Sequence, residues 1–237
     1  MRIDVITAFP KMIEAPLNES IIKQAQKKIG LQIKIWDLRM FATDKHRTLD
    51  DTPYGGGPGM VMKAEPIFKA LEKIASEPEG RENTRVIFPT PQGEIFNQNY
   101  AEKLSECDHL IFLCGHYKAV DQRVMDKWIT DEISVGDYVL SGGEIPTLLI
   151  IDALVRLIPG AMSDINSAKT DSFQGHLLDC PYYTRPEKIG DQRVPEILLT
   201  GDHKKIEEWR LGKKIEKTKI RRPDLYQKYI ESQEINK

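Results

Sequence analysis

The sequence of 237 residues predicts an α/β fold with a mostly parallel sheet, followed by a small helical domain. Short runs rich in β-branched and aromatic residues alternate with helical patterns as far as about residue 158. Three of these runs end in a polar turn that contains glycine, at residues 91–93, 114–117 and 136–143. In a parallel sheet such turns gather at the carboxyl ends of the strands, where ligands bind. The sequence therefore predicts one small-molecule pocket built from three turns.

Five short segments are predicted to be strands, at residues 3–7, 32–38, 85–89, 109–113 and 132–135. Helical patterns occupy residues 18–29, 64–76, 97–105, 120–128 and 147–158. Gly30 and the Pro159-Gly160 pair mark helix ends, and Pro146 suits the first turn of the last helix. Residues 40–62 show no clear period and are too long for a simple connector, so we expect a functional loop there.

We expect a first domain over residues 1–159, a linker over 160–172 and a C-terminal domain over 173–237. The linker is predicted from a run of small and polar residues, and the last domain from helical patterns at 206–214 and 223–229. Between residues 204 and 228, ten lysines and arginines face only four acidic residues, although the net charge of the chain is −2. This local imbalance favours a polyanionic partner such as nucleic acid, and a solvated helix face is the alternative.

Cysteine content and hydropathy predict a cytoplasmic protein. Cys107, Cys114 and Cys180 are few, odd in number and scattered, which argues against a disulfide framework. The first apolar run carries charges and lacks the core of a signal peptide. The most apolar helix, residues 147–158, is interrupted by Asp152 and Arg156 and is too short to span a bilayer.

Three sequence features resemble other kinds of site. The glycines between Gly55 and Gly59 are not followed by the Gly-Lys-Ser/Thr of a phosphate-binding loop. Cys107 and His109 are separated from Cys114 and His116 by a predicted strand, which at about 3.3 Å per residue puts the two pairs roughly 16 Å apart, too far for one zinc ion. Cys114 as a nucleophile lacks an assigned base. No metal ligand is predicted.

Two charged residues have both a structural and a functional interpretation. Asp152 and Arg156 are four residues apart, the spacing of an ordinary helical ion pair. The rest of their helix is almost wholly apolar, so a guanidinium buried there needs a partner or a ligand. Asp171 closes the polar linker, where most aspartates are turn or cap residues.

Several motifs, taken in order along the chain, closely resemble the bacterial tRNA (guanine-37-N1) methyltransferases of the SPOUT superfamily. Any one of them is weak, but the ordered set covers essentially the whole chain and is highly specific. The matching segments are Asp44-Lys45-His46-Arg47-Thr48, residues 51–60, Pro91-Gln92-Gly93, residues 136–144, Asp171-Ser172-Phe173, residues 178–186, Trp209-Arg210 and Arg221-Arg222-Pro223.

This resemblance implies a sheet tied into a deep trefoil knot, whose loops hold S-adenosylmethionine. It also implies a homodimer in which the active site is shared between subunits, and tRNA as the partner. The residues expected to line the cofactor are Pro91, Gly93, Gly115, Tyr117, Val135, Gly136, Asp137, Tyr138, Val139, Leu140, Gly142, Gly143 and Pro146.

The resemblance also implies the chemistry of methyl transfer to N1 of guanosine-37, the nucleotide 3′ to the anticodon. Guanine N1 carries a proton, so a carboxylate must remove it, and Asp171 is the matching residue. Arg156 is the matching cation for the charge that develops toward O6. Where the family commonly has Cys-Gly-Arg-Tyr-Glu-Gly, this chain has His116 and Lys118, which puts the family's magnesium requirement in doubt.

Three rival functions stay open at this point. A knotted methyltransferase could act on another RNA base, and a non-catalytic RNA-binding module could keep the pocket for sensing. The presence of both Arg156 and Asp171 disfavours the second rival. A nucleotide-hydrolysing enzyme is disfavoured because no lysine follows the glycines of residues 55–59.

Overall fold

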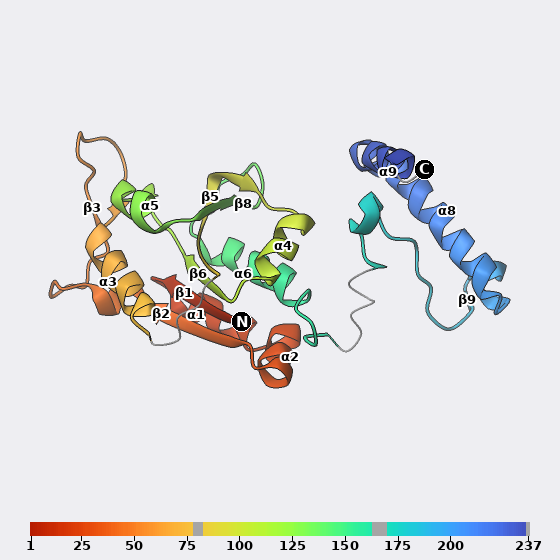
Figure 1. Cartoon of the computed structure of the whole chain (residues 1–237), viewed down its shortest axis with the longest axis horizontal. Helices are drawn as coiled ribbons and strands as arrows, with labels where there is room; N and C mark the ends of the chain where they lie inside the picture. The colour runs from red at the N-terminus through yellow and green to blue at the C-terminus, as the bar shows by residue number, and fades with distance from the viewer. Residues whose placement is uncertain (78–82, 163–169, 236–237) are drawn as a thin grey trace. The chain divides into compact units, whose positions relative to one another are not determined.

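The chain forms two compact units, Met1–Ile165 and Asn166–Lys237 (Figure 1). The computed structural model describes residues 1–77, 83–162 and 170–235. Part of the predicted linker, residues 163–169, lies outside the described residues. Each unit is described by itself.

The first unit is built on five parallel strands in the order β2-β1-β6-β5-β8. These strands are β1 (Arg2–Thr7), β2 (Gln32–Asp37), β5 (Thr84–Ile95), β6 (His109–Leu113) and β8 (Asp131–Ser134). Every residue of β1 and β6 is buried, as expected for central strands of a parallel sheet that is covered on both faces. The predicted α/β class with a mostly parallel sheet is therefore confirmed.

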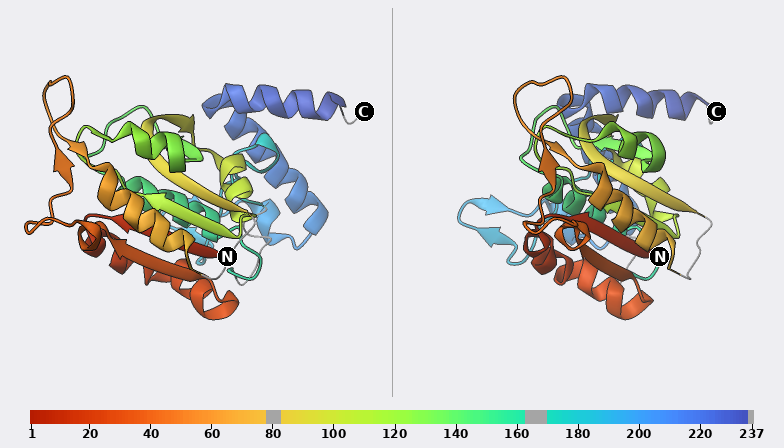
Figure 2. Two further views of the ribbon diagram at one scale, coloured as in Figure 1. Left: turned by 60° about the vertical axis from the view of Figure 1, so that its left-hand side comes forward. Right: turned by 90° about the vertical axis from the view of Figure 1, so that its left-hand side faces the viewer.

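Helices cover both faces of this sheet and enclose two apolar cores (Figure 2). The first core contains side chains of α1 (Pro10–Leu17), α2 (Ser20–Ile29), α4 (Gln98–Ser105) and α6 (Glu144–Val155). The second contains side chains of η1 (Leu38–Phe41), α3 (Ala64–Ala75) and α5 (Gln122–Trp128). Strand β1 supplies Ile3 and Val5 to the first core and Ile6 to the second, because successive side chains of a strand point to opposite faces.

A smaller sheet takes two of its strands from residues 40–62, the segment that was predicted to be a functional loop. It consists of β3 (Asp50–Asp51), β4 (Val61–Met62) and β7 (Ala119–Val120), with β4 antiparallel to β3 and parallel to β7. The loop between β3 and β4 projects from the first unit (Figure 1) and carries Tyr54, whose side chain is fully exposed. Gly55, Gly56 and Gly57 all have positive φ, a conformation that favours glycine.

Strand β5 is longer than predicted. Residues 91–93, expected to be a turn, lie inside β5, which continues to Ile95 past a register shift between Pro89 and Glu94. Gly93 makes this possible, since a Cβ there would lie 2.3 Å from the carbonyl carbon of Glu132 in β8. The absence of a side chain lets the two backbones approach closely.

The second unit contains two long helices and a short hairpin. Its elements are η2 (Gln174–His176), β9 (Lys188–Ile189), β10 (Gln192–Arg193), η3 (Glu196–Leu199), α8 (His203–Arg221) and α9 (Pro223–Ile235). Thr218 of α8 is buried, and its hydroxyl accepts a hydrogen bond from the backbone N–H of Leu178 at 2.8 Å. Asp202 caps α8, so this helix begins earlier than the predicted residue 206. Among the described helices, none combines the length and apolar character needed to cross a membrane.

Candidate active site

A pocket of about 590 Å³ opens at the carboxyl ends of β5, β6 and β8. All of its lining residues belong to the first unit. They are residues 88–92, 115–120, 122, 125, 132–136, 138–143 and 146. The pocket therefore combines the segments that the three predicted turns occupy, although the first of these is strand rather than turn.

Most of the residues predicted to hold the cofactor line this pocket. They are Pro91, Gly115, Tyr117, Val135, Gly136, Tyr138, Val139, Leu140, Gly142, Gly143 and Pro146. Gly93 and Asp137 are not among the lining residues: Gly93 packs against the backbone of β8, and Asp137 is exposed.

Two glycines let the loop after β8 meet the loop after β6. Gly143 donates a backbone hydrogen bond to the carbonyl of Gly115 at 2.8 Å. A Cβ on Gly143 would lie 2.7 Å from the Cα of Cys114, and one on Gly115 would lie 2.7 Å from the ring of Phe88. Small residues are therefore required here by contact with neighbouring atoms, and the wall of the pocket is largely backbone.

A buried carboxylate joins these loops to β1. Glu144, the first residue of α6, is only 1% exposed. Its Oε1 accepts a hydrogen bond from the Thr7 hydroxyl at 2.6 Å, and its Oε2 lies 2.7 Å from Nε2 of His116. The aromatic ring of Phe9 lies against the His116 ring, with 4.7 Å between centroids. The position of Glu144 at a helix N-terminus also favours its negative charge.

This network was not predicted from the sequence. His116 was considered as a zinc ligand and as a departure from the family's motif, and Glu144 only as part of a motif. A signal was present, because Glu144 is an acidic residue at the start of an almost wholly apolar helix. A carboxylate in such a place must be paired when it is buried.

Comparison with known proteins assigns the chain to a family. A family model described as tRNA (Guanine-1)-methyltransferase TrmD matches residues 1–228. A protein of Dictyoglomus turgidum is 50% identical over 234 residues, which cover 99% of this chain and 93% of that protein. Proteins of Anoxybacillus flavithermus and Moorella thermoacetica are 47% and 50% identical, over 97% and 95% of this chain and 93% and 90% of their own lengths. All three are named tRNA (guanine-N(1)-)-methyltransferase.

The chain belongs to the tRNA (guanine-1)-methyltransferase family. The resemblance seen in the ordered motifs is thereby confirmed. The family's glycine-rich motif at residues 136–143 contributes seven residues to the lining of the pocket.

Polar groups at the pocket of this methyltransferase come mainly from backbone and neutral side chains. Glu132 is the one acidic residue in the described lining, while Lys118 is exposed there. Among the described residues, no group of three or more His, Cys, Asp or Glu side chains is arranged so that it could hold a metal ion. Burial and a hydrogen bond with Asp50 raise the pKa of the Tyr117 hydroxyl, so Tyr117 links the pocket to β3 as a neutral phenol.

Cys114 lies beside the pocket loop but is not available as a nucleophile. It is fully buried, and its Sγ lies 3.4 Å from the Thr147 hydroxyl. Burial, together with the nearby charge of Glu144, raises the pKa of the Cys114 thiol far above its ordinary value. The thiolate required for nucleophilic attack is therefore disfavoured.

The two residues with predicted catalytic roles lie in different units. Arg156 is half-buried at the C-terminal end of α6 in the first unit. Asp171 is half-buried in the second unit, where its backbone carbonyl accepts a hydrogen bond from Gln174 at 3.4 Å. Neither residue is among those that line the pocket within the first unit.

Many cations of the basic cluster at residues 204–228 are paired within the second unit. The pairs are Lys205 with Asp202, Arg210 with Glu207, Lys213 with Glu216, Lys214 with Asp179 and Arg222 with Asp224. In the described part of the chain, Lys204, Arg221 and Lys228 form no ion pair and are exposed. Lys219 is likewise exposed without an ion pair, and its Nζ lies 5.9 Å from the centroid of the Tyr226 ring. Fewer unpaired positive charges are therefore available to a polyanion than the count of ten lysines and arginines implied.

Proposed function

We propose that this family member transfers a methyl group from S-adenosylmethionine to N1 of guanosine-37 in tRNA. The observation that carries the proposal is that the glycine-rich motifs shared with the family form one pocket at the carboxyl ends of β5, β6 and β8. The products would be N1-methylguanosine-tRNA and S-adenosylhomocysteine.

The pocket has the size and the polarity for this methyl donor. Its volume of about 590 Å³ lies within the range of small-molecule sites. Phe88, Val135 and Leu140 offer apolar surface to the adenine ring, and the loop backbones offer donors and acceptors to its edge. When bound, S-adenosylmethionine supplies a methyl group activated by its sulfonium charge. The contribution of the loops is to orient that group and to exclude water.

Asp171 and Arg156 are proposed to act on the guanine. Guanine N1 is a weak nucleophile while it carries its proton, so we assign Asp171 as the base that accepts this proton. Arg156 would stabilise the negative charge that develops toward O6. Its half-buried place at the end of an apolar helix supports this role, because a guanidinium interacts more strongly with charge when it is removed from water.

A homodimer is proposed to bring these residues together, with Asp171 supplied by the partner subunit. The support is an apolar face on the first unit, formed by Phe9, Met12, Ile145 and Leu149, each of them 41–53% exposed. Helices α1 and α6, which carry this face, are in contact with each other. Helix α6 was predicted to be buried on most sides, and a second copy of the chain would cover the side that is exposed.

The trefoil knot also belongs to the proposal. Strand β5 lies between β6 and β8 in the sheet, yet the loop after β8 reaches the end of β6, where Gly143 bonds to Gly115 and Gly142 pairs with His116. This course past β5 supports a threaded chain.

The domain limits 1–159, 160–172 and 173–237 stay a prediction. The binding of tRNA phosphates by the last domain is also a prediction, and Lys204, Arg221 and Lys228 are its exposed candidates.

The decisive experiment is a labelled-methyl assay with tRNA transcripts. We expect incorporation from S-adenosylmethionine into a transcript with guanosine at position 37, and none when adenosine replaces it. Nucleoside analysis of the product should give N1-methylguanosine. Label at another base would establish a different RNA target, and cofactor binding without any transfer would favour a sensing module.

A further inference from the structure

The contact between His116 and Glu144 ties together the two loops that form the wall of the pocket. His116 follows β6, and its backbone pairs with Gly142 of the loop that follows β8. Its N–H donates to Sδ of Met62 at 3.1 Å, which fixes the same loop to β4. The His116 side chain is 14% exposed and points to Glu144 rather than to solvent.

We infer that His116 is a positioning residue for the methyl donor, acting through Glu144. By donating to Oε2 of Glu144, the imidazole holds residues 115–118 and 140–143 in one arrangement before any ligand arrives. The inference rests on the proposed function, because it assigns the donor S-adenosylmethionine to this pocket. In this role His116 does not touch the reacting atoms. It keeps the loops ordered in the free protein, which lowers the free energy that must be spent on ordering them when the methyl donor binds.

The packing around this contact leaves little freedom for another arrangement. A Cβ on Gly142 would lie 2.2 Å from Cε1 of His116 and 2.7 Å from Oε2 of Glu144. Without the imidazole donor, Glu144 would keep the Thr7 hydroxyl on Oε1 and leave Oε2 buried without its donor. A buried carboxylate that loses a donor recovers solvation by moving toward water, and here that movement would displace the pocket loops.

Two substitutions of similar size separate the hydrogen bond from the bulk of the ring. His116→Gln places an amide nitrogen near the position of Nε2, whereas the shorter side chain in His116→Asn stops near Nδ1 and cannot reach Glu144. We expect H116N to raise the Kd of S-adenosylhomocysteine about tenfold, the usual effect of one lost hydrogen bond to a charged group. We expect H116Q to stay within about threefold of wild type, since it keeps a neutral donor.

The measurements are titration calorimetry without tRNA, followed by steady-state kinetics. In H116N the KM for S-adenosylmethionine should rise, while kcat at saturating S-adenosylmethionine and the KM for tRNA stay close to the wild-type values. Equal affinity in H116N and wild type would overturn the inference. So would a fall in kcat alone.

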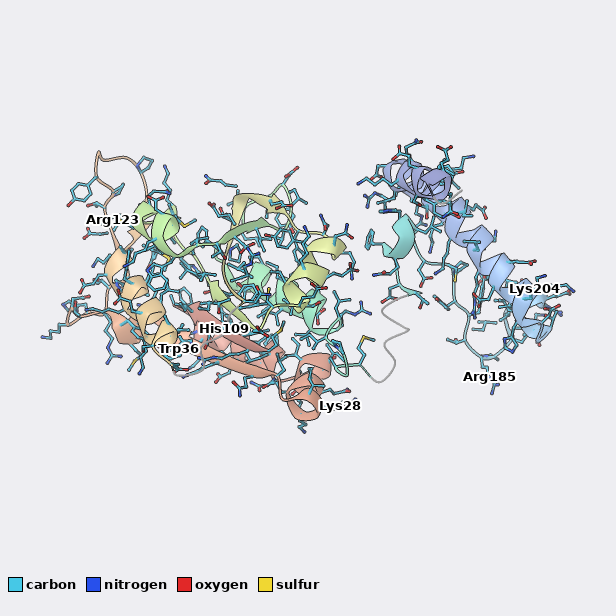
Figure 3. The ribbon with its side chains drawn as sticks, viewed as in Figure 1. Lys28, Trp36, His109, Arg123, Arg185 and Lys204 are labelled. Atoms are coloured by element: carbon cyan, nitrogen blue, oxygen red, sulfur yellow. The ribbon has the colours of Figure 1, made fainter. Side chains whose placement is uncertain are left out.

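A second histidine provides the matched control. His109, at the start of β6, has its Nε2 2.6 Å from Oδ2 of the buried Asp4, beside Trp36 (Figure 3). His109→Asn should lower stability and leave the Kd of S-adenosylhomocysteine unchanged, because this pair lies at the opposite end of the strand from the pocket. If H109N weakened binding as much as H116N, general destabilisation would explain both results and the inference would fail.

A further variant keeps the test valid if H116N does not fold. Thr7→Val removes the other hydrogen bond to Glu144 with little change in volume, and it should raise the same Kd. Unchanged affinity in T7V would then overturn the inference. If wild-type protein bound no S-adenosylhomocysteine at all, the proposed function would fail rather than the role of His116.

Discussion

At the scale of single residues, two buried carboxylates with different hydrogen-bond partners serve different purposes. Glu144 faces the pocket loops, whereas Asp4 is fully buried among Arg2, Trp36 and His109. Burial acts to raise the pKa of Asp4, but hydrogen bonds from His109, Arg2 and Trp36 outweigh it, so the pKa lies below its ordinary value. Asp4 therefore stabilises the fold in its ionised form.

We predict that Asp4→Asn lowers the free energy of unfolding near pH 7 by about 3 kcal/mol, the usual cost of breaking a buried charge pair from one side. The contribution of Asp4 is present above its unfolded pKa of about 3.9 and is lost as pH falls through the lower folded pKa. Wild type should therefore lose more stability than D4N in urea unfolding as pH falls below about 4. Parallel pH profiles would contradict this assignment.

Asp171 is the residue on which the proposed chemistry depends. We predict that Asp171→Asn lowers the rate of methyl transfer by about 10²- to 10⁴-fold, because the amide cannot accept the proton of guanine N1. The Kd of S-adenosylhomocysteine should stay as in wild type. Asp191→Asn, in the turn between β9 and β10 of the same unit, is the control and should keep full activity. Transfer by D171N at the wild-type rate would remove Asp171 as the base.

At the scale of elements, the pairing of β5 with β8 builds one side of the pocket. The register shift between Pro89 and Glu94 lets β5 follow β8 on both sides of residues 91–93. Ile87, Phe88 and Pro89 pair with β8 before the shift, and Glu94 and Ile95 pair with it after the shift. A Cβ on Gly93 would lie 2.3–2.4 Å from backbone atoms of Glu132 and Ile133, so the shape of this wall depends on a missing side chain.

We predict that Gly93→Ala lowers the free energy of local unfolding of β5 by about 2 kcal/mol, since the new methyl group would overlap the backbone of β8. Hydrogen exchange with mass spectrometry measures this local unfolding free energy for each segment of the chain. Gly212→Ala is the matched control: no atom lies within 4 Å of its Cβ position, and it sits inside α8. This change should raise protection of α8 by up to about 1 kcal/mol. Equal protection of β5 in G93A and wild type would contradict the close approach.

At the scale of the whole molecule, a single chain contains a pocket and an apolar face but holds its two proposed catalytic residues in separate units. Helix α6 connects these features. Its first residue, Glu144, contacts His116 of a pocket loop. Ile145 and Leu149 form part of the apolar face, and Arg156 is the residue at the C-terminal end of the helix. A dimer built on this face would place a second chain next to the helix that carries Arg156.

We predict that Leu149→Glu shifts the protein from dimer to monomer in sedimentation velocity and abolishes methyl transfer. A charge in the centre of an apolar interface is left without solvation, which costs several kcal/mol, or roughly a 100-fold or greater loss in association. Leu211→Glu is the matched control, because Leu211 is 46% exposed on α8 and Leu149 is 44% exposed on α6. A dimer that survives L149E would move the interface elsewhere.

The α/β class, the positions of the five main strands and most of the residues expected at the cofactor pocket could be predicted from the sequence alone. Strand β6 was predictable because a buried parallel strand is a nearly continuous apolar run, and β1 because its residues alternate and then run apolar. Two of the three glycine turns were predictable because their motifs are local, whereas residues 91–93 form strand. Helix α1 was missed, and it contains Pro16, a residue that weakens a helical pattern when it lies inside a helix.

Only the tertiary structure decided which distant residues pair. The approach of Thr7 and His116 to Glu144, and of Arg2, Trp36 and His109 to Asp4, joins residues that are up to 137 positions apart. No local pattern encodes such pairs, because burial and the sheet order β2-β1-β6-β5-β8 bring them together. The length of β5 past residues 91–93 was decided in the same way, by a contact with β8 that only a glycine allows.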